Sequence, residues 1–308
     1  MRILVTGGLG AVGAPLTDEL RQRGHEVWVL DRPHHHGLNG RYYFRADVGE
    51  FRQLENVFAQ VAFDFVYHAA AEFGRINGED FYETMWRSNA VGTKNLIRLQ
   101  ERLGFRMVDF SSSEIYGDWG DVMHEDVPRQ HPLRQLNDYA ISKWVNELQV
   151  FNSAAVRHTE SVIVRLFNTY GPGEPYSDYR SVICKFVYSA LNELPYTVYL
   201  NHHRTSSYVD DTIRTLANIT DKFHPGAVYN IAGKTYHDIK TVSDMILRLC
   251  GRTDRLVQYV DFEQHNTRDK KASTARAEED LHHCETVGLE EGLARTIAWQ
   301  REYYGVRS

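Results

Sequence analysis

Short apolar segments alternate with longer amphipathic segments through the first half of the chain. Runs rich in β-branched and aromatic residues predict strands at Arg2–Thr6, Glu26–Leu30, Phe65–His68, Arg106–Phe110 and Ser161–Leu166. Between the first two runs, Val12, Leu16 and Leu20 recur at the spacing of one helix face, and helical periods also cover Trp86–Arg102 and Tyr139–Ala155. Alternation of this kind is typical of βαβ units, so we predict an α/β fold with a doubly wound parallel sheet.

The pattern changes in the second half. After about Gly171 the chain enters a loop that contains Pro172, Gly173 and Pro175, and helices are predicted again near 181–191, 210–221 and 289–304. We therefore predict one domain over residues 1–170 and a smaller α/β lobe over residues 171–308. This division allows some segments of residues 171–308 to belong to the sheet of the first domain.

Composition places the chain among ordinary globular proteins. It has 308 residues, of which 42% are hydrophobic, 25% charged and 12% aromatic. The net charge of -6 and the lack of a Lys/Arg run argue against nucleic acid as a partner. Nothing approaches the ~18 apolar residues of a membrane span, and the first apolar run is too short for a signal peptide. We expect a cytoplasmic protein without a membrane partner.

Cysteines and histidines give no reason to predict a metal site. The three cysteines are Cys184, Cys250 and Cys284, widely spaced and odd in number, which excludes a disulfide framework and fits a reducing compartment. Three adjacent side chains in the run at 34–36 cannot converge on one ion, so we interpret this His-His-His run as a surface loop.

A glycine-rich turn joins the first strand to the first helix. Its sequence, Thr6-Gly-Gly-Leu-Gly-Ala-Val-Gly13, follows a strand and opens a helix, where glycines allow the backbone to approach a pyrophosphate at the helix N-terminus. Asp31 ends the second strand and can accept the hydrogen bonds of an adenosine ribose diol. Its charge would repel the extra phosphate of NADP, so NAD is favoured, although the neighbouring Arg32 keeps NADP as an alternative. These features predict a Rossmann-type nucleotide site.

Two further segments suggest acid–base chemistry. Tyr139 and Lys143 lie one helical turn apart and project from the same helix face. A nearby lysine ammonium favours the phenolate, so we expect Lys143 to lower the pKa of Tyr139 and make the pair a usable acid–base. The serines at 111–113 follow a strand, and ligands of open α/β sheets bind at strand C-termini.

Together these motifs resemble the NAD-dependent epimerase/dehydratase family, the extended short-chain dehydrogenases/reductases that act on nucleotide-sugars. The likeness runs along nearly the whole chain and follows the family's order. The segments that carry it are TGGLGAVG at 6–13, Asp31, Asp47-Val48, HAAA at 68–71, Asn89, SSSEIYG at 111–117, YAISK at 139–143, RLFNTYGPGE at 165–174 and RTSSYVDD at 204–211. The resemblance implies NAD as cofactor, a nucleotide-sugar as substrate and a homodimer built on the helices 86–102 and 139–155.

The resemblance also implies roles for individual residues. Cofactor contacts fall on Gly7, Gly10, Ala11, Val12, Gly13, Asp31, Arg32, Asp47, Val48, Ala69, Ala70, Asn89, Tyr139 and Lys143. By the same resemblance, Ser112 hydrogen-bonds the sugar hydroxyl that is oxidised and Tyr139 removes its proton, while hydride passes to NAD. Lys143 would also hold the nicotinamide ribose. The 4-keto sugar that results has acidified C–H bonds beside the ketone.

Positions 113 and 114 bear on the chemistry after oxidation. Glu114 resembles the glutamate of sugar 4,6-dehydratases and uronate decarboxylases, and could remove a proton alpha to the ketone, which suggests reaction at C3 or C5. The alternative is a polar residue that caps the next loop. Ser113 stands where 4,6-dehydratases have an aspartate acid, which argues against elimination of water. We count both residues among the candidate catalytic groups.

Candidate substrate contacts lie in several places. The segment from Glu72 to Arg75 resembles the loop of GDP-sugar 3,5-epimerases and GDP-fucose synthases, so both side chains could face the sugar or form a surface ion pair. Asn168 resembles the family's asparagine that contacts the sugar or its phosphate. Arg204 and Arg268 are candidates for the pyrophosphate, which a guanidinium binds through paired hydrogen bonds.

The leading hypothesis is an NAD-dependent nucleotide-sugar epimerase, an isomerase that works through a transient keto-sugar. A 4,6-dehydratase or a uronate decarboxylase, both lyases, is the nearest alternative. Two others keep the fold without the redox cycle: a pyranose–furanose mutase, for instance on a GDP-sugar, and a binding protein that senses NAD. The set of Ser112, Tyr139 and Lys143 argues against a mere sensor.

Overall fold

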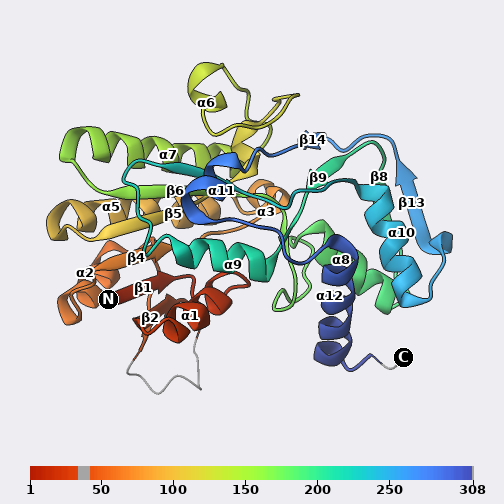
Figure 1. Ribbon diagram of the computed structural model, residues 1–308, viewed down its shortest axis with the longest axis horizontal. Coiled ribbons are helices and arrows are strands. Elements are labelled where there is room, and N and C mark those ends of the chain that lie inside the picture. Colours follow the sequence, from red (N-terminus) through yellow and green to blue (C-terminus); the bar gives the residue numbers. More distant parts are fainter. Residues whose placement is uncertain (34–41, 307–308) are drawn as a thin grey trace. The chain divides into compact units, whose positions relative to one another are not determined.

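The protein is described by a computed structural model that covers residues 1–33 and 42–306, coloured along the chain in Figure 1. The histidine run at 34–36 lies outside these residues. The chain forms two compact units that are interleaved in sequence. Unit 1 contains residues 1–115, 137–165 and 216–229, and unit 2 contains residues 116–136, 166–215 and 230–308. The chain thus leaves the first unit at residue 116, well before the predicted boundary at 170, and returns to it twice.

A seven-stranded sheet, with strands between residues 2 and 231, confirms the predicted α/β fold. Its strand order is β11-β6-β5-β4-β1-β2-β3, and the pairs β1–β2, β1–β4, β2–β3 and β4–β5 are parallel. The strands are β1 (Arg2–Thr6), β2 (Glu26–Asp31), β3 (Tyr43–Arg45), β4 (Phe65–His68), β5 (Arg106–Ser112), β6 (Ser161–Leu166) and β11 (Val228–Ile231). The order steps outward from β1 in both directions, as in a doubly wound sheet.

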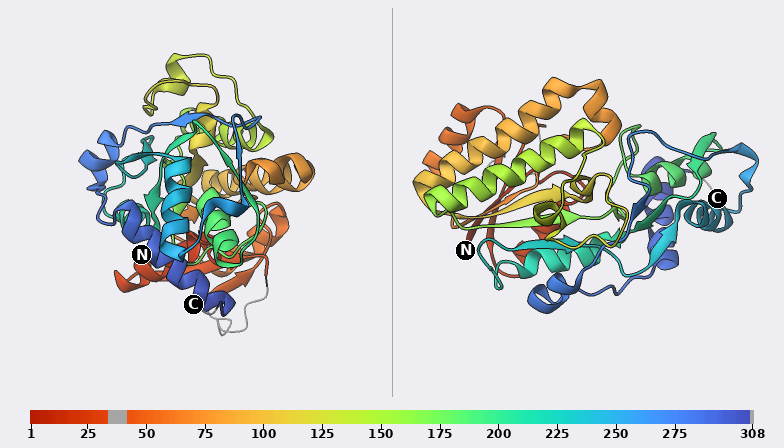
Figure 2. Two further views of the ribbon diagram at one scale, coloured as in Figure 1. Left: turned by 90° about the vertical axis from the view of Figure 1, so that its right-hand side faces the viewer. Right: turned by 90° about the horizontal axis from the view of Figure 1, so that it is seen from above.

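Unit 1 has helices alongside its sheet, and the longer ones bury an apolar face. These helices are α1 (Gly13–Gln22), α2 (Phe51–Gln60), α3 (Arg75–Asp80), α4 (Tyr82–Trp86), α5 (Gly92–Leu103) and α7 (Asp138–Arg157), together with the π turn η1 (Arg87–Val91) and the 3-10 turn η2 (Ser113–Tyr116). Leu54, Leu96 and Val150 bring α2, α5 and α7 into one buried core with the strands. In Figure 2, α5 and α7 lie side by side.

One predicted helix is interrupted. The segment predicted as a helix over Trp86–Arg102 consists of the end of α4, the π turn η1 and α5. A π turn inserts one residue into the helical ladder and is often found at functional sites. The turn contains Asn89, a predicted cofactor contact that is 1% exposed. The periodicity of apolar residues did not reveal this insertion.

Unit 2 combines short strands with helices. The helices are α6 (Val127–Gln130), α8 (Val182–Leu191), α9 (Val209–Asn218), α10 (Ile239–Cys250), α11 (Ala275–Leu281) and α12 (Leu289–Tyr304), with the 3-10 turn η3 (Asp254–Leu256). The strands are β7 (Thr169–Tyr170), β8 (Tyr196–Tyr199), β9 (His203–Thr205), β10 (Ser207–Tyr208), β12 (Tyr236–Asp238), β13 (Val257–Val260) and β14 (Asp269–Lys270). Helices α8, α10 and α12 pack together, as Figure 1 shows. Among the described helices, none is both long and apolar enough to cross a membrane.

Candidate catalytic and cofactor site

The turn after β1 leaves no room for side chains at two of its glycines. Gly7 has φ of 69°, and a Cβ atom there would lie 2.7 Å from the backbone nitrogen of Ala70. A Cβ at Gly13, the first residue of α1, would lie 2.1 Å from the carbonyl oxygen of Gly7. The turn is therefore packed tightly between the end of β4 and the start of α1. Such a turn presents backbone N–H groups at a helix N-terminus and fits the pyrophosphate of a dinucleotide.

Asp31 lies beside this turn, where β2 ends. Its Oδ2 accepts a hydrogen bond from the backbone nitrogen of Leu9 at 3.0 Å, and its Oδ1 accepts one from the nitrogen of Arg32 at 2.8 Å. The guanidinium of Arg32 turns to Glu72, with 2.6 Å between Nη2 and Oε1. Glu72 also accepts from the amide of Asn77 at 3.2 Å. The structure thus places Asp31 beside the glycine-rich turn, and Glu72 forms its ion pair with Arg32.

The remaining predicted cofactor residues surround the same edge of the sheet. The backbone nitrogens of Ala69 and Ala70 lie 3.2 and 3.3 Å from the carbonyl and hydroxyl oxygens of Thr6. Asp47 accepts a bond from the nitrogen of Gly49 at 2.8 Å, and Val48 is 5% exposed. All of these residues belong to unit 1.

Asn89 links this edge to α7. Its Oδ1 accepts from the nitrogen of Glu72 at 2.8 Å, and its Nδ2 donates to the Glu72 carbonyl at 3.1 Å and to the Ser142 hydroxyl at 3.0 Å. A side-chain amide can donate through its nitrogen and accept through its oxygen at the same time. Asn89 therefore holds the loop that follows β4 against the helix that carries Tyr139.

Ser112 and Tyr139 come together at the end of β5. The Ser112 side chain is close enough to lower the pKa of Tyr139, and both side chains are buried, with exposed fractions of 7% and 4%. Lys143 lies one turn further along α7, and its Nζ donates to the carbonyl oxygen of Phe110 at 2.6 Å. The three predicted residues thus meet where the C-terminal end of a central strand faces the N-terminal turns of a helix.

The expected lowering of the Tyr139 pKa by Lys143 is wrong for this structure. Burial raises the pKa of Tyr139 well above its ordinary value, and the charge of Glu114 raises it further. The hydrogen bond from Ser112 acts in the opposite direction and favours the phenolate. Burial also lowers the pKa of Lys143, while Asp109 and Glu147 raise it. Desolvation, which the sequence does not show, outweighs the spacing of the two residues.

Glu114 lies in η2, directly after Ser113, which is 3% exposed. The backbone nitrogen of Glu114 donates to the hydroxyl of Ser112 at 3.2 Å, and its carboxylate accepts from the amide of Asn137 at 3.4 Å. Asn137 is the N-cap of α7 and accepts from the nitrogen of Ala140 at 2.8 Å. The start of the helix that carries Tyr139 is therefore fixed to the residue that follows the serines at 111–113.

The other predicted substrate residues belong to unit 2. Asn168 has φ of 43°, and its Oδ1 is buried with no hydrogen-bond partner among the described residues. The guanidinium of Arg204 is 5% exposed and donates to the carbonyl oxygens of His203 and Arg268, both at 2.8 Å. Arg268 is exposed and donates from Nε to the carbonyl of Asn201 at 3.2 Å. The two arginines thus lie on neighbouring segments of unit 2.

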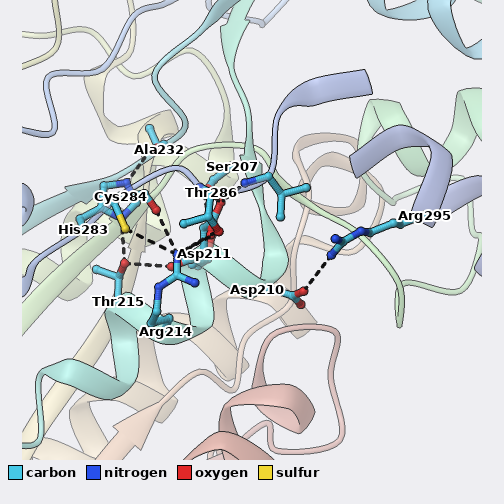
Figure 3. A network of polar contacts seen from close by, with 12 residues as sticks. Ser207, Asp210, Asp211, Arg214, Thr215, Ala232, His283, Cys284, Thr286 and Arg295 are labelled. Atoms are coloured by element: carbon cyan, nitrogen blue, oxygen red, sulfur yellow. Dashed lines mark hydrogen bonds and ion pairs between the residues drawn. The ribbon is translucent and has the colours of Figure 1, made fainter. Parts of the chain in front are cut away.

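Asp211 anchors the start of α9 within unit 2, as Figure 3 shows. Its carboxylate accepts from the backbone nitrogens of Thr286 and Val287 at 2.9 and 3.1 Å and forms an ion pair with Arg214. Hydrogen bonds from Thr286, Val287 and Arg214 lower the pKa of this carboxyl although burial opposes them. Asp211 therefore fixes the start of α9 to the segment at 286–287 within unit 2.

A family model matches residues 3–232, three quarters of the chain, and its description is the NAD dependent epimerase/dehydratase family. The chain belongs to this family. The predicted resemblance is thereby confirmed, and so is NAD as the cofactor on which the family depends. The residues around Gly7, Gly13 and Asp31 fit this cofactor, because the close-packed glycines and the acidic strand end are the features that dinucleotide binding requires.

Relatives of the chain are nucleotide-sugar enzymes. UDP-glucuronic acid decarboxylase 1 of Xenopus tropicalis is 29% identical over 98% of this chain and 72% of its own length. UDP-glucuronate 4-epimerase of Thermodesulfobacterium geofontis is 26% identical, with 97% of this chain and 96% of the relative covered. Among solved structures, MoeE5 in complex with UDP-glucuronic acid and NAD is 27% identical, with a TM-score of 0.86 over 98% of this chain and 100% of that chain.

The family motifs did not identify all residues that position the site. Asn137 could have been recognised, because an asparagine before an acidic first turn is a common helix N-cap. The buried pair of Glu147 and Arg165, whose Oε2 and Nη2 atoms lie 2.7 Å apart, had no such signal. These two residues are on α7 and β6, and only the parallel sheet brings them together.

Proposed function

We propose that this member of the family is an NAD-dependent epimerase of a UDP-uronic acid that oxidises and re-reduces C4 of the sugar. The observation that carries the proposal is the buried grouping of Ser112 beside Tyr139, with Lys143 one turn further along α7 and bonded to the Phe110 carbonyl. The choice of a UDP-uronic acid is supported by the decarboxylase, the epimerase and MoeE5, since these relatives act on, or are bound to, UDP-glucuronic acid.

Each residue of the site has a distinct task in this proposal. When bound, NAD supplies the acceptor and donor of hydride. Ser112 and Tyr139 hold the C4 hydroxyl between them, and Tyr139 takes up its proton during oxidation. The Ser112 hydrogen bond favours the phenolate that this step needs, whereas burial favours the neutral phenol that returns the proton during reduction. Lys143, one turn further along the same helix, holds the nicotinamide ribose and is itself fixed by the carbonyl of Phe110 on β5.

We also propose which residues bind the ligands. The cofactor lies on the turn from Gly7 to Gly13, with its adenosine ribose at Asp31. For the substrate, Asn168, Arg204 and Arg268 bind the diphosphate and its sugar. Support for Asn168 comes from its buried, unpartnered oxygen, because a buried carbonyl oxygen without a donor is costly unless a ligand supplies one. Glu72 and Arg75 remain candidates for the sugar.

A uronate decarboxylase is the second candidate, supported by Glu114 and by the decarboxylase relative. A ketone at C4 of a uronic acid lies beta to the carboxylate, an arrangement that loses CO2 readily. An epimerase must hold the ketone so that hydride returns before this happens. Glu114 places a negative charge close to Ser112 and Tyr139. In a decarboxylase, this group would be available to exchange a proton with C5.

Product analysis tests the proposed function. The protein is incubated with UDP-glucuronic acid and NAD, and nucleotide-sugars and CO2 are measured. We expect UDP-galacturonic acid without CO2; a pentose product with stoichiometric CO2 would assign the decarboxylase instead. Tyr139→Phe should lower the rate by about 10²–10⁴-fold. Tyr82→Phe, which keeps the ring that stacks on Trp86, is the matched control and should retain the rate. Wild-type protein that holds NAD and converts no UDP-uronic acid would contradict the proposal.

The proposed assembly is a homodimer built on α5 and α7. Leu103 of α5 and Ile141 and Leu148 of α7 are exposed to 55%, 40% and 47%. Apolar side chains on two adjacent helices fit burial against a second copy. Light scattering in solution should give twice the mass of one chain.

A further inference from the structure

Asp109 is a buried acid in the middle of the central sheet. It lies on β5 between Val108 and Phe110 and is 1% exposed. Neither of its carboxylate oxygens has a hydrogen-bond partner among the described residues. A carboxyl group in this environment is costly, and an apolar side chain would fill a core position without that cost. Packing therefore gives no reason for an acid at this position.

The groups that face Asp109 belong to the proposed catalytic centre and its support. His68 of β4 is its register partner, and bonds from its two ring nitrogens to Thr6 and Thr93 hold it in place. On α7, Lys143 and Glu147 both interact electrostatically with the carboxyl. Arg165 of β6 pairs with Glu147, which also accepts a bond from Ser111 at 2.5 Å.

Among these groups, Lys143 and Asp109 are the two whose charges no other member of the set pairs with. Burial lowers the pKa of His68 to about 3, so this ring is neutral. Glu147 is paired with Arg165, whose guanidinium binds both carboxylate oxygens, at 2.9 and 2.7 Å. One cation and one acid remain on this face of the sheet, and the Lys143 ammonium bonds to the carbonyl of Phe110, the residue next to Asp109.

We propose that Asp109 is a positioning residue that acts through Lys143: its buried carboxylate keeps the lysine in the charged form in which it holds the nicotinamide ribose. The proposal rests on the proposed function for the role of Lys143. Burial raises the pKa of Asp109 to about 7, and Lys143 counteracts part of that rise. Asp109 and Glu147 both raise the pKa of Lys143 against the effect of burial, and Asp109 has the larger effect.

Thermal stability tests the interaction without any activity. Because the folded-state pKa of Asp109 is raised from 3.8 to about 7, wild-type stability should fall, relative to Asp109→Asn, as pH rises between these values and level off above about 7. In a Lys143→Met background, the stability difference caused by Asp109→Asn should level off at a higher pH, because the lysine no longer favours the carboxylate. Asp64→Asn, at an exposed acid that pairs with Arg2, is the control and should show neither effect. Identical pH dependence in both backgrounds would overturn the proposal.

The pH profile of kcat/KM tests the consequence for Lys143. Asp109→Asn removes the negative charge that raises the lysine pKa, so the loss of activity at high pH should begin at lower pH than in wild type. Asp64→Asn should keep the wild-type profile. An unchanged high-pH limb in Asp109→Asn overturns the proposal. If the wild-type protein converts no nucleotide-sugar, the proposed function fails, while the stability comparison still decides whether Asp109 and Lys143 interact.

Discussion

At the scale of single residues, burial controls the chemistry of the site. Ser112, Tyr139 and Lys143 are at most 7% exposed, and desolvation is the largest influence on the pKa of both titratable members. The family motifs predicted which residues meet, because their types and spacings are visible in the chain. Their protonation behaviour depends on Glu114, Asp109 and Glu147 as well, and on how much water the fold excludes.

Glu114→Gln should shift the pH dependence of the reaction. The negative charge of Glu114 raises the pKa of Tyr139, so its removal should lower that pKa and move the low-pH limb of kcat/KM to lower pH. Glutamine keeps an oxygen for the amide of Asn137. The control is Glu55→Gln, at a surface acid of α2 that pairs with Arg102. A limb that stays in place would show that Tyr139 does not limit the rate at low pH.

Gly13→Ala should damage the cofactor turn. The new Cβ would lie 2.1 Å from the carbonyl oxygen of Gly7, so the turn must move or the helix must start elsewhere. We expect a loss of stability of about 1–3 kcal/mol, the usual range for overpacking, together with weaker NAD binding in calorimetry. Gly120→Ala, where the added atom meets nothing within 4 Å, should change neither quantity. Unaltered NAD affinity in Gly13→Ala would contradict the assigned role of the turn.

At the scale of elements, local sequence patterns predicted several strands and helices. Elements that depend on contacts between distant segments were not predicted. The strands at Arg2–Thr6, Phe65–His68 and Ser161–Leu166 and the helix at Leu289–Tyr304 have the predicted bounds. By contrast, β3 and β11 were not predicted. The first has three residues, too few for a period-2 pattern. The second joins the sheet only by pairing with β6, which is far away in sequence. The π turn at Asn89 is defined by contacts to Glu72 and Ser142 that no local pattern contains.

The N-cap of α7 should matter for activity as well as for stability. Asn137→Ala removes the bond to the Ala140 nitrogen and the bond to Glu114, and should cost about 0.5–2 kcal/mol in unfolding free energy measured with urea. Ser181→Ala removes the cap of α8 in unit 2 and is the matched control. We expect a similar stability loss in both variants but a lower kcat only in Asn137→Ala. Equal kcat in the two variants would contradict a positioning role for Asn137.

At the scale of the whole molecule, the units are interleaved. The chain passes from unit 1 to unit 2 within residues 115–116 and returns at residue 137, so Tyr139 and the serines at 111–113 belong to one unit although a segment of the other separates them. Domain boundaries predicted from a change of pattern place one division near residue 170. The earlier crossing has no compositional signal, because it is defined by contacts such as that of Tyr116 with Asn230, whose side chains lie 2.7 Å apart.

Ligand binding to the folded protein should raise its melting temperature. NAD at about 100 times its dissociation constant would add about 2.7 kcal/mol, measured by differential scanning fluorimetry. NADP should add less, because Asp31 repels the 2′-phosphate and Arg32 is paired with Glu72. Asp31→Asn should reduce the difference between the two cofactors. A larger shift with NADP than with NAD would contradict the assigned role of Asp31.

The proposed function requires that hydride leaves C4 of the sugar and returns to it within one active site. UDP-glucuronic acid labelled with deuterium at C4 tests this most directly, with mass spectrometry and NMR of the product. We expect the product to retain deuterium at C4, and Tyr139→Phe to form it at least about a hundredfold more slowly than wild type. Loss of the label to solvent, or product formation by Tyr139→Phe at the wild-type rate, would contradict the proposed function.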